Sequence, residues 1–193
     1  DDIIVGGNNT NVGDIIDFTN STLGVNLDLN TPDGVQQDLL NGSFITLSQI
    51  ENVIGSKKDD VFKSNVNVSN NIDGGDSTTD DDTISYITLE VNDVTKDYLY
   101  SESISNITIY QNGVQGSAVD SLSRIENIIA TNGNDTTNFL DSIDSIKIWG
   151  EGGNDTIRGG KKEDSLYGGA GDDIIEGGEG DDTIDYSNAL SKI

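Results

Sequence analysis

Aliphatic residues near the C-terminus return at every ninth position, with glycine and acidic residues between them. Written in nines, residues 150–185 read GEGGNDTIR, GGKKEDSLY, GGAGDDIIE and GGEGDDTID. The eighth position is always aliphatic: Ile157, Leu166, Ile175 and Ile184. A nine-residue period is too short for a helical repeat and fits a turn of about six residues followed by a strand of about three. The pattern predicts a solenoid of stacked short strands, with these four residues in its core.

A longer repeat covers much of the remaining chain. LSQIENVIGSKKDDVF (47–62) parallels LSRIENIIATNGNDTT (122–137), and GGNNTNVGDIIDF (6–18) parallels GGDSTTDDDTISY (74–86). A third copy begins at GGEGDDTIDYS and is not completed by Ile193, which suggests that the sequence is cut from a longer one.

Alternating apolar and polar residues in 24–29 and 106–114 predict further strands, and no segment has a convincing helical pattern. We therefore expect an all-β chain organised as three segments that form one solenoid. These are a first β-solenoid module (1–73), a second (74–149) and a nonapeptide β-roll (150–193).

The charge of the chain limits the classes of partner that it can bind. It has 35 acidic residues against 10 basic ones, a net charge of -25. Nucleic acid and anionic membrane surfaces would repel such a chain, which leaves cations as its natural partners. Hydrophobic residues make up only 33%, so apolar burial alone is a weak basis for folding.

Cysteine, histidine and methionine are absent from the sequence. The usual ligands of zinc, copper and iron–sulfur centres are therefore missing, as are the groups that most nucleophile–base catalysis uses. No apolar run reaches membrane-spanning length. We expect a non-enzymatic protein that does not insert into membranes.

The nonapeptides resemble the RTX (repeat-in-toxin) calcium-binding family, whose consensus is G-G-x-G-x-D-x-U-x. The resemblance implies a parallel β-roll or β-helix-like solenoid, stabilised by calcium in its Gly/Asp turns. It also implies that turns two repeats apart share an ion, so that 150–155 pairs with 168–173 and 159–164 with 177–182. The residue chemistry agrees, because calcium takes six to eight oxygen ligands and glycine lets a turn direct several carbonyls to one point. Magnesium fits less well, since it keeps its waters and demands octahedral geometry.

The candidate calcium ligands are therefore backbone and side-chain groups of these turns: Gly150, Gly152, Asn154, Asp155, Gly159, Lys161, Glu163, Asp164, Gly168, Ala170, Asp172, Asp173, Gly177, Glu179, Asp181 and Asp182. Glu151 and Lys162 stand where the consensus has glycine. We expect the Asp155/Asp173 site to be the tighter one. The Asp164/Asp182 site should be weaker or should turn Lys162 outward.

Further acidic turns remain open between a calcium site and a solvated surface turn: Asp14, Asp60, Asp82 and Asp135. The long loop GGDSTTDDD (74–82) is open in the same way. The glutamates of the two IEN segments, Glu51 and Glu126, are expected to make hydrogen bonds at a solenoid corner, with calcium binding as the alternative. Trp149 is expected to be a packed or rim aromatic residue rather than a ligand platform.

Three functions fit these features. The first, which the tandem modules favour, is a calcium-rigidified module of a secreted bacterial surface protein, of adhesin or surface-layer type. The second is the noncatalytic tail of a secreted protease, lipase or polysaccharide-modifying enzyme, and the third is a carbohydrate-binding module. The resemblance implies type I secretion. The chain would then be unfolded in the low-calcium cytosol and would fold outside the cell. Besides calcium, the expected partners are neighbouring copies, other domains of the parent chain or cell-surface polysaccharide.

Overall fold

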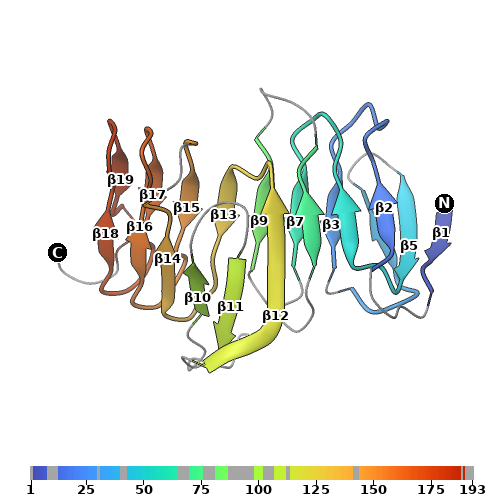
Figure 1. Ribbon diagram of the computed structural model, residues 1–193, viewed down its shortest axis with the longest axis horizontal. Coiled ribbons are helices and arrows are strands. Elements are labelled where there is room, and N and C mark those ends of the chain that lie inside the picture. Colours follow the sequence, from blue (N-terminus) through green and yellow to red (C-terminus); the bar gives the residue numbers. More distant parts are fainter. Residues whose placement is uncertain are drawn as a thin grey trace.

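The computed structural model describes residues 2–7, 13–29, 31–39, 43–64, 70–75, 81–86, 98–101, 107–111, 114–140, 144–187 and 189. Within these ranges the chain forms β-strands and no helix. No membrane-spanning helix is therefore found among the described residues. Its coils follow one another along a single long axis, with the N- and C-termini at opposite ends (Figure 1). The prediction of an all-β solenoid is confirmed.

One face of the solenoid is a continuous parallel sheet of seven strands. In sheet order from the N-terminal end these are β3 (Asn26–Asp28), β7 (Val61–Lys63), β9 (Thr83–Ser85), β13 (Asn127–Ile129), β15 (Lys147–Trp149), β17 (Ser165–Tyr167) and β19 (Thr183–Asp185). The sheet includes strands from all three predicted segments, so those segments share one continuous ladder of backbone hydrogen bonds.

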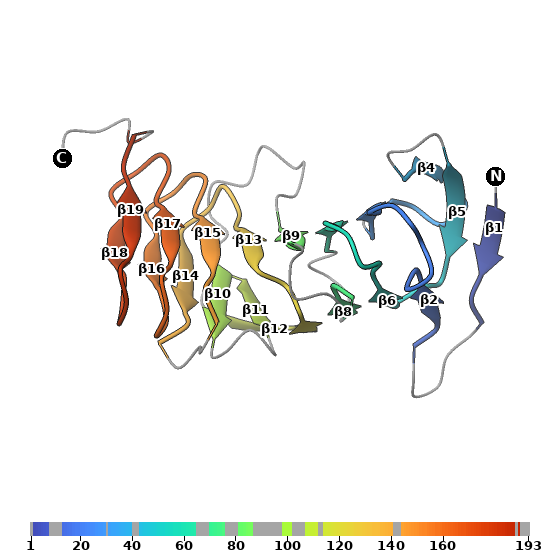
Figure 2. The ribbon, with the colours of Figure 1, turned by 90° about the horizontal axis from the view of Figure 1, so that it is seen from above.

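The opposite face is built from two further sheets. The first contains β2 (Ile15–Asp17), β6 (Asn52–Ile54), β8 (Asn71–Asp73), β12 (Val114–Ser123) and β11 (Ile107–Gln111). The second contains β10 (Tyr98–Ser101), β14 (Asp135–Asn138), β16 (Thr156–Arg158) and β18 (Ile174–Glu176). Figure 2 shows β14, β16 and β18 in one row and β15, β17 and β19 in the row that faces it. The chain thus alternates between the two faces with each nonapeptide.

Two antiparallel pairings depart from the parallel pattern. β11 pairs with β12, and β4 (Gln36–Asp38) pairs with β5 (Phe44–Ser48), which also pairs in parallel with β1 (Asp2–Val5). Both lie in stretches where the long repeat is weakest. The predicted strand in 106–114 is confirmed as β11 and that in 24–29 as β3, although residues 106, 112 and 113 lie outside the described part.

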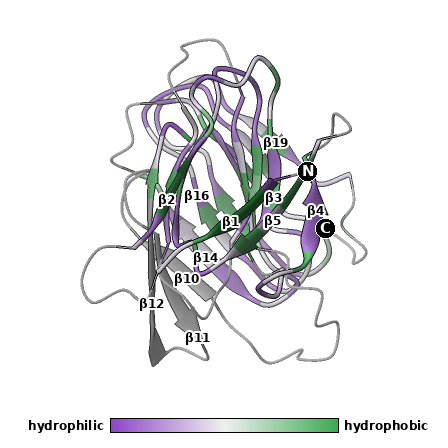
Figure 3. Ribbon diagram, turned by 90° about the vertical axis from the view of Figure 1, so that its right-hand side faces the viewer, coloured by the Kyte–Doolittle hydropathy of each residue, from purple (hydrophilic) through white to green (hydrophobic). Residues whose placement is uncertain are grey.

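The core runs between the two faces and is formed mainly by the middle residues of the short strands. Leu27, Phe62, Ile84, Ile148, Ile157 and Leu166 are each 0% exposed. Register places each of them beside the middle residue of the next coil, as Ile148 lies beside Leu166. Seen from the end, the coils lie one behind another around this core (Figure 3).

The prediction that all four eighth-position residues are core is wrong for the last coil. Ile157 and Leu166 are fully buried, Ile175 is partly buried and Ile184 is 42% exposed. Ile184 has a neighbour on one side only among the described strands, because β19 pairs with β17 and stands at the edge of its sheet.

Candidate metal centre

The four nonapeptide turns are stacked in two pairs, as the family resemblance implies. Turn 150–155 leads into β16 and turn 168–173 into β18, which are parallel neighbours. Turn 159–164 leads into β17 and turn 177–182 into β19, which are also parallel neighbours. A backbone bridge between Gly152 and Ala170 joins the first pair directly. Turns two repeats apart therefore face each other across one coil spacing.

The sixth-position aspartates link the two turns of each pair. The Asp155 N–H donates to Asp173 Oδ1 at 2.9 Å, and the Asp164 N–H donates to Asp182 Oδ1 at 3.0 Å. Asp155 is 1% exposed and Asp164 is 2% exposed. Each pair thus brings two carboxylates together, at least one of them deeply buried.

The remaining carboxylate oxygens differ between the two pairs. Within the described residues, Asp155 Oδ2 and Asp173 Oδ2 are buried and have no hydrogen-bond partner. Asp164 Oδ2 instead accepts the Gly160 N–H at 2.6 Å. A buried carboxylate oxygen without a donor costs several kcal/mol or more unless a cation satisfies it. The first pair therefore has two buried carboxylate oxygens to which no described residue donates a hydrogen bond.

Burial also perturbs the titration of these groups. It raises the pKa of Asp155 to about 8, with the Asp135 and Asp173 carboxylates raising it further against the hydrogen bond that the Asp135 N–H donates. Burial likewise raises the pKa of Asp164, against hydrogen bonds from Gly160 and Ile146. Both shifts have one physical cause: the turns place negative charge where water cannot solvate it.

The first glycine of each turn makes room for the carboxylate. A Cβ at Gly150 would come too close to Asp155 Oδ2 and the Gly168 carbonyl oxygen, and one at Gly159 would meet Asp164 Oδ2 and the Gly177 carbonyl oxygen. A side chain at these positions would occupy the space in which carboxylate and carbonyl oxygens face one another. The two closest atoms at each position are a carboxylate oxygen and a carbonyl oxygen, which are ligands that suit a hard cation such as calcium.

Several of the other predicted ligand positions have side chains that face solvent. The side chains of Lys161, Glu163, Asp172, Glu179 and Asp181 are exposed, as is Lys162. The exposure of Lys162 agrees with one of the two alternatives expected for this site, and its weaker affinity stays a prediction. Within the described ranges no group of three or more acidic side chains gathers at one point. A cation here would be held by one carboxylate from each of two turns, with the rest of its oxygen shell from backbone carbonyls.

The family comparison decides what these turns are. Residues 149–184 match the family described as the RTX calcium-binding nonapeptide repeat, in four copies. Residues 149–184 are RTX repeats. The repeats bind calcium as a structural ligand and typify extracellular bacterial proteins that leave the cell by type I secretion. No curated protein matches the chain.

The turn of Asp60 reproduces the second RTX pair, although it lies outside the matched residues. The Ser56 N–H donates to Asp60 Oδ2 at 2.6 Å, as Gly160 does to Asp164. The Asp60 N–H donates to Asp82 Oδ1 at 2.8 Å, as Asp164 does to Asp182. Asp60 and Asp82 are 0% and 1% exposed, so neither is a solvated surface aspartate. Residues 76–80 of the connecting loop lie outside the described part.

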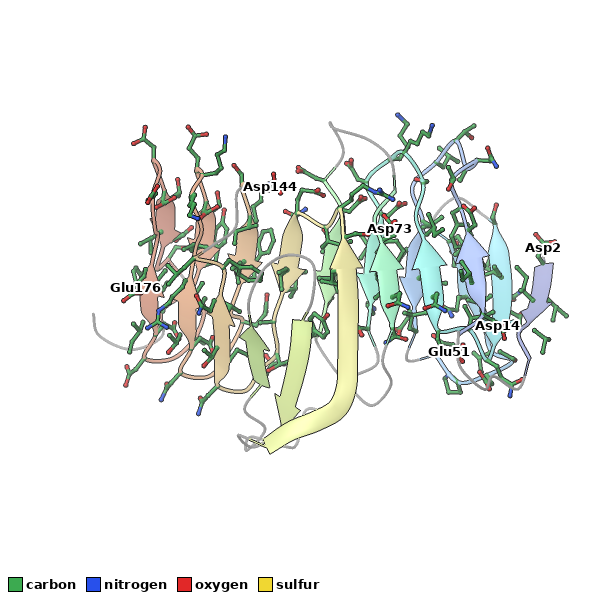
Figure 4. The ribbon with its side chains drawn as sticks, in the orientation of Figure 1. Asp2, Asp14, Glu51, Asp73, Asp144 and Glu176 are labelled. Carbon is green, nitrogen blue, oxygen red and sulfur yellow. The ribbon has the colours of Figure 1, made fainter. Side chains whose placement is uncertain are left out.

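Glutamate takes the place of aspartate in the IEN segments. The Asp14 N–H donates to Glu51 Oε2 at 3.0 Å, and the Asp82 N–H donates to Glu126 Oε2 at 2.9 Å. Asp14 and Glu51 lie close together near the N-terminal end of the solenoid (Figure 4). The predicted hydrogen bonds of both glutamates are confirmed. The position of each glutamate in the sequence already indicates this role, because each directly precedes a short strand, as the RTX aspartates do.

Asp135 joins the other stack of turns. Its N–H donates to Asp155 Oδ1 at 2.8 Å, so Asp155 lies between Asp135 and Asp173. Asp135 is 1% exposed and its Oδ2 accepts the Thr131 N–H at 2.8 Å. The structure therefore extends this stack one coil upstream of the matched repeats.

Proposed function

We propose that the chain is a calcium-dependent structural module of a secreted bacterial surface protein, of adhesin or surface-layer type. It remains unfolded where calcium is scarce and folds where calcium is abundant. The observation that carries this proposal is the pair of buried carboxylate oxygens, Asp155 Oδ2 and Asp173 Oδ2, which have no donor among the described residues. Their place in RTX repeats makes calcium the cation expected there.

The energetics favour coupled binding and folding. At a net charge of -25 the chain repels itself, and its core is narrow, formed mainly by the middle residues of three-residue strands. Without a cation, folding would bury carboxylates against one another in addition to the loss of chain entropy. A cation that binds the folded turns and not the open chain adds its binding free energy to folding.

The continuous sheet supports a surface module rather than an enzyme tail. Seven parallel strands pass through all three segments without a break, so tandem modules lengthen one rod. A rod that stiffens on calcium suits a protein that spans distance or tiles a surface. In this proposal the chain has no catalytic role.

Circular dichroism of the chain in chelator and in millimolar calcium tests the proposal. We expect a disordered spectrum in chelator and a β-sheet spectrum in calcium, with magnesium at the same concentration unable to replace calcium. A β-sheet spectrum of equal strength in chelator would contradict the proposal.

A second candidate function, carbohydrate binding, rests on a separate feature. Trp149 and Tyr167 are register partners on β15 and β17, and their rings stack with centroids 5.2 Å apart and planes at 6°. Trp149 therefore packs on Tyr167, whereas its expected role as a packed or rim residue rather than a ligand platform stays a prediction. The rings border a hollow of about 270 Å³ whose other lining residues are Glu151, Gly169, Ala170, Asp185 and Ser187. Aromatic faces beside carboxylates and a hydroxyl are chemistry suited to sugars.

Binding of the calcium-loaded chain to bacterial polysaccharides tests this second function. Trp149→Ala should abolish retention if the hollow binds sugar, whereas Phe44→Ala, at an exposed aromatic on β5, should not change it. Equal retention of both variants, or none by the wild type, would remove this candidate.

A further inference from the structure

The outer side of the seven-stranded sheet carries two aromatic rings and a carboxylate on its last strands, β15, β17 and β19 (Figure 1). The middle residues Ile148 and Leu166 point into the core, so the residues that follow them point outward, because side chains alternate along a strand. Register places Trp149 beside Tyr167, and Tyr167 beside Asp185. All three are only partly buried, so this row is accessible to a ligand.

The two rings cover each other on one face only. Their centroids lie 5.2 Å apart with planes at 6°, and neighbouring strands are about 4.8 Å apart. The rings therefore stack along the direction in which the strands follow one another. Trp149 backs the Tyr167 ring on the side of β15, and the opposite face of that ring is turned toward Asp185 on β19.

Tyr167 and Asp185 also border the hollow of about 270 Å³, whose other charged lining residue is Glu151. Among the described residues that line it there is no lysine or arginine. An aromatic face attracts a cation through its negative quadrupole, and carboxylates attract it through their charge. The hollow is therefore better suited to a positively charged ligand than to a neutral or negative one.

Both carboxylates are available to such a ligand. The salt bridges in the described part of the chain include neither Glu151 nor Asp185. The Ser187 N–H donates to Asp185 Oδ1 at 2.6 Å, which holds the carboxylate in place and lowers its pKa. The hollow thus combines a fixed negative charge on one wall with a ring face on another.

Glu151 stands at the second position of its repeat, where the RTX consensus has glycine. Its φ is 70°, in the left-handed region that a residue with a Cβ adopts at an energetic cost. Glycine would serve this turn without that cost, so the turn itself gives no reason for a glutamate. Strained backbone of this kind is concentrated at functional positions.

We infer that the hollow binds an amino sugar, with its protonated amino group against the free face of the Tyr167 ring and with Glu151 and Asp185 as its carboxylate partners. This inference rests on the second candidate function, carbohydrate binding, and narrows the ligand to a cationic sugar such as the glucosamine units of an N-deacetylated polysaccharide. An ammonium group donates three hydrogen bonds, enough for both carboxylates. The apolar side of the sugar ring would pack on the aromatic rings, and the Ser187 hydroxyl would be available to a sugar hydroxyl.

The charge of the whole chain acts in the same direction. A net charge of -25 repels polysaccharides that carry carboxylate, sulfate or phosphate groups and attracts those that carry amino groups. The long-range field would bring a cationic polymer to the surface. The hollow would then select the sugar unit.

The fluorescence of Trp149 reports on this hollow directly, because the chain contains a single tryptophan. The calcium-loaded full chain would be titrated with oligomers of glucosamine, N-acetylglucosamine, galacturonic acid and lysine, matched in length, at a mildly acidic pH that protonates the amino groups. We expect saturable binding of the glucosamine oligomer that changes the Trp149 emission. The N-acetylglucosamine oligomer, which lacks the charge, should bind about tenfold more weakly or less. The galacturonic acid and lysine oligomers should leave the emission unchanged.

Three substitutions test the carboxylates. Glu151→Gln and Asp185→Asn should each weaken binding of the glucosamine oligomer by about tenfold, the usual loss for a hydrogen bond between charged groups. Glu151→Gly should weaken it similarly while keeping the fold, since glycine adopts positive φ without strain. The control Glu176→Gln also removes one charge, from an exposed side chain on β18 that pairs with Arg158, and should leave the affinity unchanged.

Circular dichroism in calcium would establish that each variant is folded. Equal binding of the glucosamine and N-acetylglucosamine oligomers would overturn this inference and leave carbohydrate binding in place, whereas binding of no sugar would overturn both. Lysine oligomers that bind as tightly as glucosamine oligomers would show that the sugar ring is not recognised. Equal affinity of folded Glu151→Gly, Asp185→Asn and Glu176→Gln would show general attraction to an acidic chain. Either result would also overturn the inference, and none of these outcomes bears on calcium-dependent folding.

Discussion

The four sixth-position aspartates of the RTX repeats occupy different environments, although they hold the same position in the repeat. Asp155 and Asp173 each keep a buried oxygen without a donor in the described part of the chain, whereas Asp164 receives the Gly160 N–H. The second residue has positive φ in three of the four turns, 70° at Glu151, 94° at Gly169 and 108° at Gly178. Gly160 does not have positive φ, and its N–H donates to the aspartate of its own turn.

The two calcium sites of the RTX repeats should therefore differ in affinity. Asp173→Asn should remove the tightest phase of a calorimetric calcium titration, because it weakens the pair whose oxygens depend on a cation. Asp182→Asn should leave that phase in place, because its partner Asp164 already has a backbone donor. The two variants are matched in charge and in position within their turns. Loss of the tightest phase from Asp182→Asn alone would reverse the ranking.

Acid should partly replace calcium at Asp155. The pKa of this group is about 8 in the calcium-free fold, against an ordinary value of 3.8. A raised carboxyl pKa means that the folded state binds the proton more tightly than the unfolded state. Stability from this group is therefore present at low pH and is lost as pH rises from about 4 through about 8.

Circular dichroism of the calcium-free chain at pH 8 and pH 5 checks this sign. We expect more β-structure at pH 5, and we expect Asp155→Asn, which is neutral at both values, to reduce the difference. Equal spectra of the wild-type chain at the two pH values would show that burial of Asp155 does not limit folding.

At the scale of the strand, each three-residue element is too short to be stable and depends on its neighbours. Leu166 on β17 is 0% exposed between β15 and β19, whereas Ile184 on β19 is 42% exposed at the edge of the same sheet. The contribution of an eighth-position residue to stability thus depends on how many neighbouring coils cover its side chain.

Two alanine substitutions measure this dependence. Leu166→Ala should lower the free energy of unfolding in calcium by about 2–5 kcal/mol, the usual cost of truncating a fully buried leucine. Ile184→Ala should cost less than about 1.5 kcal/mol, because much of its side chain is already in water. Urea unfolding at saturating calcium gives both values. Equal costs would mean that β19 is covered as fully as β17.

The nine-residue register is enough to predict the short strands β16 to β19, whereas their alternation between two faces is implied by the resemblance to the RTX family. It is not enough to predict the antiparallel β11–β12 pair, which arises where the repeat is weakest. Glu126 at an aspartate position is visible from its place before β13. The unpaired oxygen of Asp155 is not, since it depends on backbone angles that no residue pattern specifies.

At the scale of the whole molecule, the chain combines a net charge of -25 with one unbroken seven-stranded sheet. Acidic side chains before the strands link coil to coil along that sheet, as Asp60 to Asp82, Asp82 to Glu126 and Asp164 to Asp182. Because the coils share their backbone ladders, folding at the RTX turns should propagate into the modules before them.

Hydrogen exchange of the full chain, measured with and without calcium, tests the central claim most directly. In calcium we expect strong protection of the buried strands around Ile157 and Leu166, extending along the shared sheet to Ile148 and Phe62. In chelator we expect that protection to be lost, first of all in residues 150–185. Protection of Ile157 and Leu166 that is the same in chelator as in calcium would contradict the account, because the turns would then fold without their cation.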